Sequence, residues 1–496
     1  MEENYMIKNV LIIMTDQQRK DSMGCYGNTF ARTSCLDHFA EESIRFNRAY
    51  VANPICMPNR HSFFSGRYPH NHGIYTNGLS LPDTGCNLPH YLTELGWQTA
   101  SIGKIHFTPT DNDAPLEAGP ESGNFWSDQH ADYEFHGPYG GFQYIELTVG
   151  HDRQRGHYRK WFLENGGDDS MFEGTTETGD KDCIAASIPE RLHPSTYVGE
   201  RTCKWLREIR DPSAPFFLVA SFSDPHAPFN PPAETVAGFS MEEVKMPVGN
   251  KEDLKSRPEH YIKHFRGEWH RSGRMPERTT PDGYNEMVTR ERIRNTYAMV
   301  HLIDKNVGTI LNTLRELKLE DETIILFTSD HGELLGDHGL WLKGPFYYEG
   351  LFNIPMLMKV PGIVAHEDNG LFSTVDVVPT LCELLNIPIP YYVDGISQAL
   401  HLQNPNIKIR DWCLAEYRNG FGSMDVASRA IITERYKYVR YQTGERELTD
   451  LEKDPFEKNN VVQNTEYAEI CSKLDQKMLQ AILNTENKYP LQVSFA

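Results

Sequence analysis

Four short, largely apolar segments, each followed at once by a polar residue, constrain the fold of this chain more than any other feature. The segments span residues 9–15, 98–103, 216–222 and 323–329, and the residues that follow them are Asp16, Lys104, Ser223 and Asp330. Such runs are typical of parallel strands that are buried on both faces of a sheet. The sequence therefore predicts a mostly parallel sheet whose strands end in polar side chains.

Helical patterns lie between these segments. From Glu291 to Leu317, apolar residues recur at spacings of three and four, which is typical of an amphipathic helix. Strands that alternate with helices build a doubly wound α/β sheet, and ligands of such sheets bind beyond the carboxyl ends of the strands. We therefore expect the four polar endings to share one edge of the sheet.

Two long stretches interrupt the alternation. Residues 109–182 are rich in Gly, Asp, His and aromatic residues, and residues 231–284 are rich in Lys, Glu, Pro and His. Both look like excursions from the core, and we expect them to form the walls of a pocket. The side chains that would grip a ring there are Trp126, His130, His136, Tyr139, Tyr144, His260, His264 and Trp269. The alternative is that these side chains pack within their own domain.

The last hundred residues have a different character. After a helix-like segment at 376–385, the Pro-rich segment 387–390 indicates a boundary. Residues 428–433 and 436–441 alternate like an antiparallel hairpin with a turn at Thr443-Gly444, and residues 467–483 have the pattern of an amphipathic helix. We therefore predict a large α/β domain at 1–390 and a smaller α+β domain with an antiparallel sheet at 391–496.

Composition limits the classes of function. The 496 residues are 39% hydrophobic and 24% charged, as expected for a globular protein with a sizeable core. The net charge of -20 offers no basic surface to nucleic acid and would repel anions at long range. Any anion site must therefore be built locally from Arg, Lys, His, a metal ion or helix N-termini.

Cysteine usage and the N-terminus indicate a location. The nine cysteines are odd in number and contain no C-x-x-C pair, which indicates reduced thiols. The N-terminus has no basic region, and its apolar run at 10–14 is too short for a signal peptide or a membrane span. We expect a cytoplasmic enzyme that does not associate with a membrane.

The segment Cys56-Met57-Pro58-Asn59-Arg60, followed by Phe64-Ser65-Gly66-Arg67, carries the most specific signal. Taken alone, Cys56 would be a small buried thiol. The segment nevertheless resembles the C-x-P-x-R signature of the sulfatase family, and further motifs of that family occur in order. They are Asp16-Gln17, Gly103-Lys104-Ile105-His106, Asp224-Pro225-His226-Ala227-Pro228-Phe229, Thr328-Ser329-Asp330-His331-Gly332 and the later Lys343.

The resemblance covers most of the chain, including a tail at 434–455 that is similar to the family's small C-terminal sheet domain. It implies an alkaline-phosphatase-like α/β/α sandwich with a large, mostly parallel central sheet, in which residues 1–390 form the catalytic domain. It also implies a sulfuric ester hydrolase that cleaves a small aryl, choline or carbohydrate sulfate, including sulfated oligosaccharides.

The resemblance implies a modification of Cys56. In the family, a formylglycine-generating enzyme oxidises this cysteine to Cα-formylglycine (3-oxoalanine), and one hydroxyl of the aldehyde hydrate attacks the sulfate ester while the other later expels sulfate. Arg60 would orient the nucleophile. Pro58 is suited to the first position of a helix, whose free N–H groups would assist the anion.

Four further catalytic residues follow from the same analogy. Lys104 and Lys343 would contact the sulfate oxygens, His106 would lie near the formylglycine hydroxyl, and His226 would donate a proton to the leaving group. Lys104 and His106 are two residues apart, which would place both on one side of an extended segment. Taken alone, each such residue is more often solvated or structural.

One divalent metal ion is implied as a cofactor. Asp16, Gln17 and Asp330 would supply oxygen ligands, His331 a nitrogen, and the matured Cys56 a further oxygen. The family favours Ca²⁺, whereas the nitrogen ligand and the lack of a second N-terminal carboxylate leave Mn²⁺ or another borderline ion as the alternative. Taken singly, each Asp would as readily be a helix N-cap. Asp337-His338 also looks like a metal pair, but we expect a polar loop there.

Departures from the family pattern define the alternatives. Asn59 replaces the usual Ser or Ala, which would slow recognition by the maturation enzyme. Gln17 in place of Asp, together with His331 in place of the frequent Asn, resembles the branch that contains phosphonate monoester hydrolases and choline sulfatases. A phosphonate monoester or phosphodiester hydrolase is therefore the second hypothesis, and a non-catalytic anion- or metal-binding protein is the third. The C-x₃-R spacing of Cys56 and Arg60 disfavours a cysteine phosphatase, which has C-x₅-R.

Overall fold

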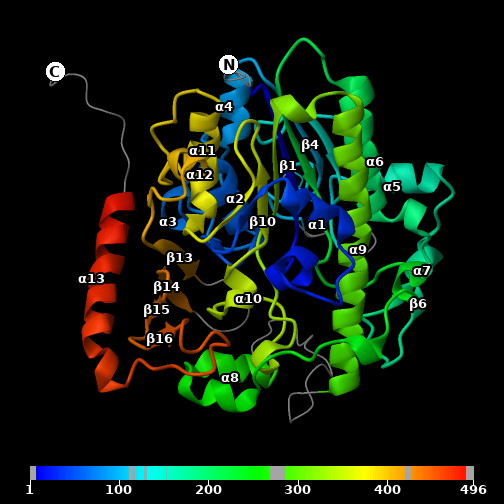
Figure 1. Cartoon of the computed structure of the whole chain (residues 1–496). Helices are drawn as coiled ribbons and strands as arrows, with labels where there is room; N and C mark the ends of the chain where they lie inside the picture. Colours follow the sequence, from blue (N-terminus) through cyan, green and yellow to red (C-terminus); the bar gives the residue numbers. More distant parts are fainter. Residues whose placement is uncertain are drawn as a thin grey trace, which may run out of the picture.

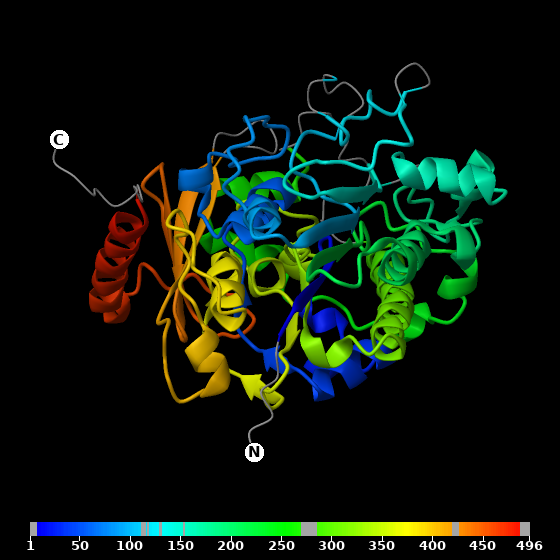
Figure 2. The ribbon, with the colours of Figure 1, turned by 90° about the horizontal axis from the view of Figure 1, so that it is seen from above.

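An eight-stranded sheet forms the centre of the computed structural model, with helices on both of its faces (Figures 1 and 2). The structure describes residues 7–110, 116, 119–127, 131–151, 154–268, 285–418 and 426–486. The strand order is β11-β2-β10-β9-β1-β8-β4-β5. The strands are β1 (Asn9–Thr15), β2 (Ile44–Phe46), β4 (Gln98–Gly103), β5 (Tyr144–Leu147), β8 (Phe216–Ser221), β9 (Thr323–Ser329), β10 (Met356–Lys359) and β11 (His366–Asp368).

All strands of this sheet except β10 run in the same direction. β9, β1, β8, β4 and β5 pair in parallel along the sheet, and β2 pairs in parallel with β11, whereas β10 is antiparallel to both of its neighbours. The central strand β1 is buried along its whole length and pairs with β9 from Asn9↔Thr323 to Thr15↔Ser329. The predicted α/β class with a mostly parallel sheet is thus confirmed.

Helices on the two faces of β1 explain why its sequence is apolar without alternation. Leu11 and Ile13 belong to one core with residues of α1, α6 and α9, and Val10, Ile12 and Met14 belong to another with residues of α2, α4 and α11. Because both faces are covered, the strand needs apolar side chains on both. The helices are α1 (Ser34–Glu41), α6 (Pro194–Lys204) and α9 (Glu286–Glu316) on one face, and α2 (Cys56–Ser65), α4 (Leu88–Glu94) and α11 (Val377–Leu384) on the other.

A second, antiparallel sheet is formed by β13 (Cys413–Arg418), β14 (Ala427–Ile432), β15 (Tyr436–Tyr441) and β16 (Arg446–Asp450), in sequence order. α13 (Ala468–Thr485), red in Figure 1, packs Leu474 and Met478 against this sheet. The backbone N–H of Glu416 in β13 donates to the carbonyl of Ala52, 2.8 Å away, and joins the two parts of the chain. The small α+β unit is confirmed, while a boundary at residue 390 stays a prediction.

The first excursion contains a core strand that the sequence did not predict. β5 lies within residues 109–182 and extends the central sheet, and α5 (His157–Glu164) packs Tyr158 and Phe162 into the core that contains Leu11 and Ile13. The segment escaped prediction because it carries Glu146, which is buried and forms an ion pair with Arg201. The view of residues 109–182 as a simple excursion was therefore wrong.

The remaining elements are short. The predicted hairpin pairs β14 with β15, but it turns at residues 433–435, and Thr443-Gly444 instead joins β15 to β16. Apart from short 3₁₀ and π turns, two small sheets and five short α-helices complete the described chain. They are β3 (Ala49–Tyr50) with β12 (Phe372–Ser373), β6 (Gly174–Thr175) with β7 (Ala185–Ala186), α3 (Pro69–His72), α7 (Ala233–Val236), α8 (Glu259–Phe265), α10 (Glu349–Phe352) and α12 (Ala399–Gln403).

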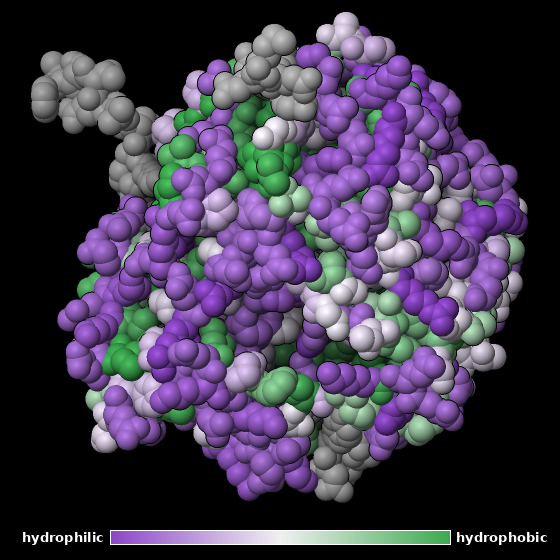
Figure 3. Space-filling view, in the orientation of Figure 1, coloured by the Kyte–Doolittle hydropathy of each residue, from purple (hydrophilic) through white to green (hydrophobic). Residues whose placement is uncertain are grey.

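The surface in Figure 3 is mostly hydrophilic. Within the described ranges, no helix is long and apolar enough to cross a membrane, and the cytoplasmic location stays a prediction. All nine cysteines fall within these ranges and none forms a disulfide, as predicted. A cleft of about 890 Å³ is lined by residues that include Arg19, Lys20, Glu349 and Arg435, but by none of the predicted site residues.

Candidate active site

The carboxyl ends of β1, β4, β8 and β9 meet at one edge of the sheet, as the sequence predicted. Backbone hydrogen bonds join the residues just beyond the strands, from Asp330 N to Thr15 O (3.0 Å) and from Asp16 N to Asp224 O (3.1 Å). The side chains of Asp16 and Asp330 are fully buried. Buried carboxylates require partners, which come from the neighbouring segments.

Gly103 allows β4 and β8 to approach each other closely at this edge. Its φ is 103°, and a Cβ at this position would lie 1.9 Å from the carbonyl oxygen of Ser221. A residue with a side chain would therefore push the strands apart. Lys104 follows, donates its N–H to the same carbonyl (2.9 Å), and places its ammonium in contact with the Asp16 carboxylate.

Cys56 is the first residue of α2, so the helix begins two residues before the predicted start at Pro58. The helix ends at Gly66, which has a φ of 68° and donates its N–H to Ser62 O (2.9 Å). The prediction that free N–H groups at the start of this helix would assist an anion was wrong in part. Met57 N–H donates to Asn77 Oδ1 (3.1 Å), and Pro58 has no N–H.

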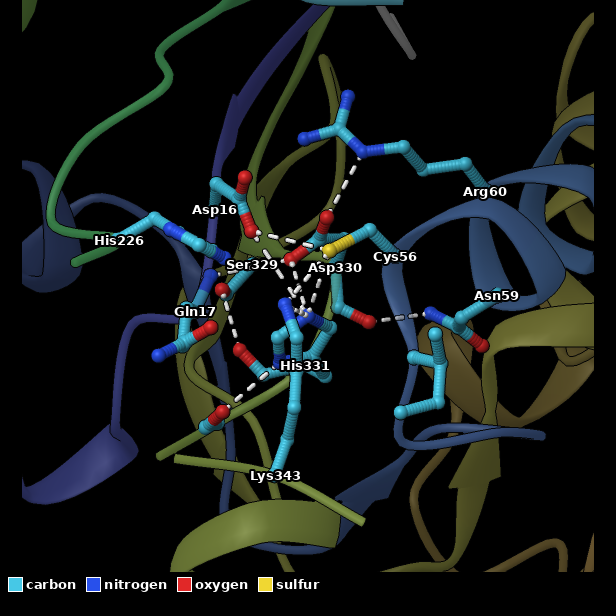
Figure 4. Close-up of polar contacts among 12 residues, drawn as sticks. Asp16, Gln17, Cys56, Asn59, Arg60, His226, Ser329, Asp330, His331 and Lys343 are labelled. Atoms are coloured by element: carbon cyan, nitrogen blue, oxygen red, sulfur yellow. Dashed lines mark hydrogen bonds and ion pairs between the residues drawn. The ribbon is translucent and has the colours of Figure 1, made fainter. Parts of the chain in front are cut away.

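The Cys56 thiol lies inside a cluster of charged and polar groups (Figure 4). Its Sγ is 2.8 Å from Lys343 Nζ, 3.1 Å from His331 Nε2 and 3.5 Å from Asp16 Oδ1. Burial, with a contribution from Asp16, raises the pKa of the thiol, although Lys104 and Lys343 act in the opposite direction. The structure thus brings together residues that are hundreds of positions apart in the sequence.

Four of these residues form a candidate metal site. Asp16, Cys56, Asp330 and His331 each bring one potential ligand atom, and these atoms all lie within 4.8 Å of one another. His331 Nδ1 is 2.8 Å from Gly332 O, which places the ring proton there and leaves the lone pair of Nε2 facing the cluster. Two carboxylates and one imidazole are a donor set that divalent metals accept.

Gln17, the predicted further oxygen ligand, follows Asp16 directly and contacts Asp330. Its N–H donates to Asp330 Oδ1 (3.0 Å) and its side-chain nitrogen donates to Glu333, so the orientation of the amide is fixed. The Oε1 atom is buried and accepts no hydrogen bond from the described residues. A buried acceptor without a donor needs a partner from outside the chain, and a metal ion would fit.

The charges around the cluster shift its pKa values. Burial would raise the pKa of Asp16, but Lys104, His226, Lys343 and His151 outweigh it and hold that pKa well below its usual range. Burial and Lys343 lower the pKa of His331 to about 4. At neutral pH the site therefore presents an ionised carboxylate and a neutral imidazole, the forms that bind metals.

Arg60 reaches from α2 to the ends of three strands. Its Nε donates to Asp330 Oδ2 (2.7 Å), and Nη1 donates to Lys104 O (2.9 Å) and Ser221 Oγ (3.0 Å). Within the described chain, Nη2 has no hydrogen-bond partner although it is buried. Arg60 therefore keeps one donor available beside Asp330.

Asn59, the departure from the usual signature, joins α2 to Asp330 of the candidate metal site. Its side-chain nitrogen donates to Asp330 O (2.5 Å), and its oxygen accepts from Ala52 N (3.1 Å) and Thr374 Oγ1 (2.8 Å). The side chain is fully buried. A Ser or Ala would be too short to make all three contacts, so Asn59 has a structural function in this chain.

Lys104 and His106 both lie at the site, but the segment between them is not extended as predicted. His106 has a φ of 60°, and Glu121 accepts the N–H groups of His106, Phe107 and Thr108. Burial, followed by the charges of Lys104 and Arg60, holds the pKa of His106 well below its usual range. Sequence reasoning missed Glu121, because nothing in its local sequence marks it as buried.

His226 lies on the Asp16 side of the cluster, beside a histidine that sequence reasoning missed. One ligand atom each of Asp16, His151 and His226 lie within 4.8 Å of one another, and His151 Nε2 is 3.1 Å from Lys104 Nζ. Burial and Lys343 hold the pKa of His226 well below its usual range. His151 follows the end of β5 by four residues, so recognition of that strand would have identified it.

Comparisons with known proteins identify the family. The profile described as Sulfatase matches residues 8–387, and that described as N-sulphoglucosamine sulphohydrolase, C-terminal, matches residues 336–484. The chain belongs to the sulfatase family. It is accordingly a sulfuric ester hydrolase of the alkaline-phosphatase-like superfamily.

Relatives of this sulfatase span its whole length. An arylsulfatase from Clostridium perfringens is 29% identical over 98% of this chain and 96% of its own. A structure in complex with its substrate, D-glucosamine-2-N,6-O-disulfate, has a TM-score of 0.74 at 20% identity and covers 98% and 99% of the two chains. The phosphonate monoester hydrolase of Silicibacter pomeroyi has a TM-score of 0.79 at 19% identity and covers 96% of each chain. The solved structures share the fold.

Of the aromatic residues expected to line the pocket of the sulfatase, Trp126, His260 and His264 are buried, and His136, Tyr139 and Tyr144 are half-buried. The Trp126 ring contacts Tyr133 and His157, and His136 stacks on Tyr144. Four of these side chains form hydrogen bonds within the chain. Tyr139 bonds to Glu121, Tyr144 to Glu146, His260 to Pro345 O and His264 to Trp341 O. A grip on a substrate ring stays a prediction for these six, while His130 and Trp269 lie outside the described residues.

Asp337 and His338 form a polar loop in this sulfatase, as expected. Asp337 forms an ion pair with Arg19 (2.8 Å), and His338 Nδ1 is hydrogen-bonded to Asp253 Oδ2 (3.0 Å). Both residues belong to a short 3₁₀ turn at Asp337–Gly339. Each side chain has its own partner, away from the cluster around Cys56.

Proposed function

We propose that this sulfatase hydrolyses an aryl, choline or carbohydrate sulfate monoester and that Cys56, matured to formylglycine, supplies the nucleophile. The observation that carries the proposal is the position of Cys56 Sγ, which lies within 3.5 Å of Asp16, His331 and Lys343. A nucleophile for a sulfate ester needs a cationic site that also admits an anion.

The local charge supports an anionic substrate in spite of the overall charge of -20. Lys104, Lys343 and Arg60 all lie within contact of the Asp16 and Asp330 cluster. Lys343 Nζ is 2.8 Å from Cys56 Sγ, so its ammonium would face the sulfate oxygens at the point of attack. Lys104 would hold the sulfate from the opposite side, beside Asp16.

A divalent metal ion would be held by Asp16, Gln17, Asp330 and His331, together with the matured residue 56. When bound, such an ion supplies positive charge that polarises the sulfate and lowers the pKa of a coordinated hydroxyl. We favour Ca²⁺ because three of these four residues offer oxygen, and Mn²⁺ is the alternative because His331 offers nitrogen. The orphaned Oε1 of Gln17 supports an oxygen-rich site.

The nucleophile would be oriented by the residues that surround position 56. A formylglycine hydrate supplies a hydroxyl that attacks sulfur and a second hydroxyl that later releases sulfate. Arg60 Nη2, which has no partner in the described chain, is the donor available to orient the hydroxyl that attacks. His106, whose pKa is held low, would be neutral and able to accept a proton from the other hydroxyl.

His226 would donate the proton to the departing oxygen of the ester. Its Nδ1 lies 2.5 Å from Ala227 O and therefore carries a proton that points away from the cluster. The Nε2 atom is left to face the substrate, and it can donate only once the ring has taken a second proton there, which the negative charge of a bound sulfate ester would favour. A positioned acid of this kind matters most when the leaving group is a poor one, such as an alkyl or sugar hydroxyl.

A phosphonate monoester or phosphodiester hydrolase that uses the same residues is the second candidate. Gln17 and His331 in the candidate metal site favour it, because they reduce the number of carboxylates around the ion. Formation of formylglycine would require a generating enzyme that recognises the Cys56, Pro58 and Arg60 pattern. For the location, we retain the sequence prediction of a cytoplasmic enzyme.

Mass spectrometry of the peptide that contains Cys56, from protein made in its native host, tests the proposal directly. The proposal expects an aldehyde at position 56 and turnover of an aryl sulfate in preference to a phenyl phosphonate monoester. The Cys56→Ala variant should be inactive towards both, and unchanged turnover would reject the mechanism. Cys86→Ala, which changes a partly exposed thiol, is the matched control.

The same measurement on Asn59→Ser separates maturation from folding. If Asn59 slows maturation, the variant will show a larger aldehyde fraction than the natural chain. If Asn59 acts only through Asp330, Ala52 and Thr374, the aldehyde fraction will be unchanged and the thermal stability will fall.

A further inference from the structure

His151 lies flat against His226. The two imidazole rings are 3.7 Å apart between centroids and inclined by only 14°. They come from different elements, because His151 follows β5 and His226 follows β8. The contact therefore joins the loops beyond two strands at the edge of the sheet where the reaction would occur.

Lys104 holds His151 in place. Its ammonium is 3.1 Å from His151 Nε2 and contacts the Asp16 carboxylate, which is 3.7 Å from the same Nε2. An ammonium group can only donate, so Nε2 accepts and the proton of the neutral ring must be on Nδ1. That Nδ1 is buried and has no hydrogen-bond partner among the described residues. The ring is thus fixed at one end by an ammonium that also belongs to the proposed sulfate site.

The same three residues could be mistaken for a second metal site, because ligand atoms of Asp16, His151 and His226 lie within 4.8 Å of one another. The ammonium of Lys104, however, already contacts both Asp16 and His151. This set also has only one carboxylate, Asp16, which belongs to the candidate metal site around Cys56 as well, whereas that site has Asp330 in addition. The arrangement therefore requires a different explanation for His151.

We propose that His151 is a positioning residue for His226, holding the plane of that ring so that the Nε2 proton of its imidazolium form passes to the leaving oxygen. His226 Nδ1 is held by Ala227 O (2.5 Å), and a single hydrogen bond leaves the ring free to rotate about it. The stacked ring of His151 removes that freedom, because rotation of His226 would drive it into His151. This inference rests on the proposed role of His226 as the proton donor.

The proposal predicts an effect that depends on the leaving group. An acid that is out of position slows hydrolysis of esters whose leaving group needs protonation, and hardly affects esters whose leaving group departs as a stable anion. Loss of the ring at position 151 should therefore steepen the dependence of kcat/KM on the pKa of the leaving phenol. Loss of the Lys104 contact alone should instead raise KM about equally for all esters.

A series of substituted phenyl sulfates tests this with two matched variants of the full-length, matured enzyme. His151→Phe keeps a flat ring against His226 but loses the contact with Lys104, and His151→Gln keeps a polar group near Lys104 but loses the ring. We expect His151→Gln to lose about tenfold or more with the poorest leaving group and less than about threefold with the best. His151→Phe should keep the natural slope. His151→Ala, which also lacks the ring, provides a second measurement should the Gln variant fail to fold.

The double variant His151→Gln/His226→Ala completes the test. If His151 acts through His226, the double variant will show the slope of His226→Ala alone. The proposal is overturned if His151→Gln and His151→Ala keep the natural slope, or if His151→Phe steepens it as much as they do. Failure of the proposed function would look different, because His226→Ala itself would then leave the slope unchanged or the natural enzyme would not cleave aryl sulfates.

Discussion

This molecule contains two buried arginine–aspartate ion pairs, which differ in how many hydrogen bonds their carboxylates accept. Arg60 pairs with Asp330 at the edge of the central sheet, and Arg410 pairs with Asp376 between the large and small parts of the chain, and all four side chains are at most 1% exposed. Both oxygens of Asp376 bind Arg410, and each accepts a second hydrogen bond, from Ser373 N (3.0 Å) or Ile396 N (2.9 Å).

The Asp330 carboxylate is less saturated, because it accepts fewer hydrogen bonds than that of Asp376. One oxygen accepts from Arg60 Nε (2.7 Å) and the other accepts from Gln17 N (3.0 Å), and Arg60 Nη2 has no partner in the described chain. A carboxylate oxygen can accept about two hydrogen bonds, so Asp330 keeps capacity for a ligand that Asp376 has used. We infer that a saturated pair, whose oxygens have all their hydrogen bonds, stabilises the fold. An unsaturated pair, which has unused donors and acceptors, can bind a ligand.

Removal of the saturated pair should have the largest effect on stability. Arg410→Met leaves Asp376 buried without its cation, which should lower the free energy of unfolding by about 3–5 kcal/mol. Urea unfolding would measure this. The variant that remains folded should keep the kcat of the natural enzyme, and a large fall in kcat would show that this pair is not purely structural.

The unsaturated pair should have the largest effect on activity. Arg60→Met removes the donor next to the nucleophile and should reduce kcat by about 10²–10³, which corresponds to about 2.7–4 kcal/mol of transition-state stabilisation. Steady-state kinetics on an aryl sulfate would measure the loss in the metal-loaded enzyme. Equal losses of kcat in Arg60→Met and Arg410→Met would show that the two pairs do not differ in their contribution to activity.

Addition of a metal ion should stabilise the folded protein through Asp330 of the unsaturated pair and not through Asp376. Ca²⁺ or Mn²⁺ at one hundred times its Kd should raise the free energy of unfolding of the metal-free protein by about 2.7 kcal/mol. Asp330→Asn should lose this increment, whereas Asp376→Asn should be less stable but keep it. Thermal unfolding with and without the ion gives the answer, and an increment that survives in Asp330→Asn would remove Asp330 from the site.

The last effect concerns the dependence of stability on pH. The pKa of His331 is lowered to about 4 by burial and Lys343, so between its ordinary value near 6.5 and 4 the unfolded chain binds a proton that the folded chain does not. The stability of the metal-free protein should therefore fall through this window as the pH is lowered, by at most about 1.4 kcal/mol per pH unit for this group.

His331→Gln should flatten that decline in pH-dependent unfolding experiments. His401 is the matched control because Asp368 raises its pKa, so its contribution changes above pH 6.5 and is already complete below it. His401→Gln should leave the slope between pH 6.5 and 4 unchanged. A slope that His331→Gln does not change would mean that another group takes up the proton.

Much of the central fold could be predicted because its signals are local. β1, β4 and β9 have the predicted boundaries, since strands covered on both faces are apolar runs that end where the chain leaves the core. β5 could not be predicted because its buried Glu146 is acceptable only when Arg201, 55 residues away, reaches it. The contacts of the aromatic residues in the excursions could not be predicted for a similar reason, because composition does not reveal which residues will meet them.

The sequence by itself determined the order of the motifs, the parallel sheet and the convergence of Asp16, Lys104, His226 and Asp330 at one edge. These follow from local periodicity and from the fact that parallel strands end on the same side. Only the tertiary structure decided that His151 stacks on His226 and that Asn59 bonds to Asp330. It also decided that Asp330 keeps hydrogen-bonding capacity that Asp376 lacks. Such features depend on which atoms meet across hundreds of residues, and the pattern of residues along the chain carries no record of how many hydrogen bonds each atom finally makes.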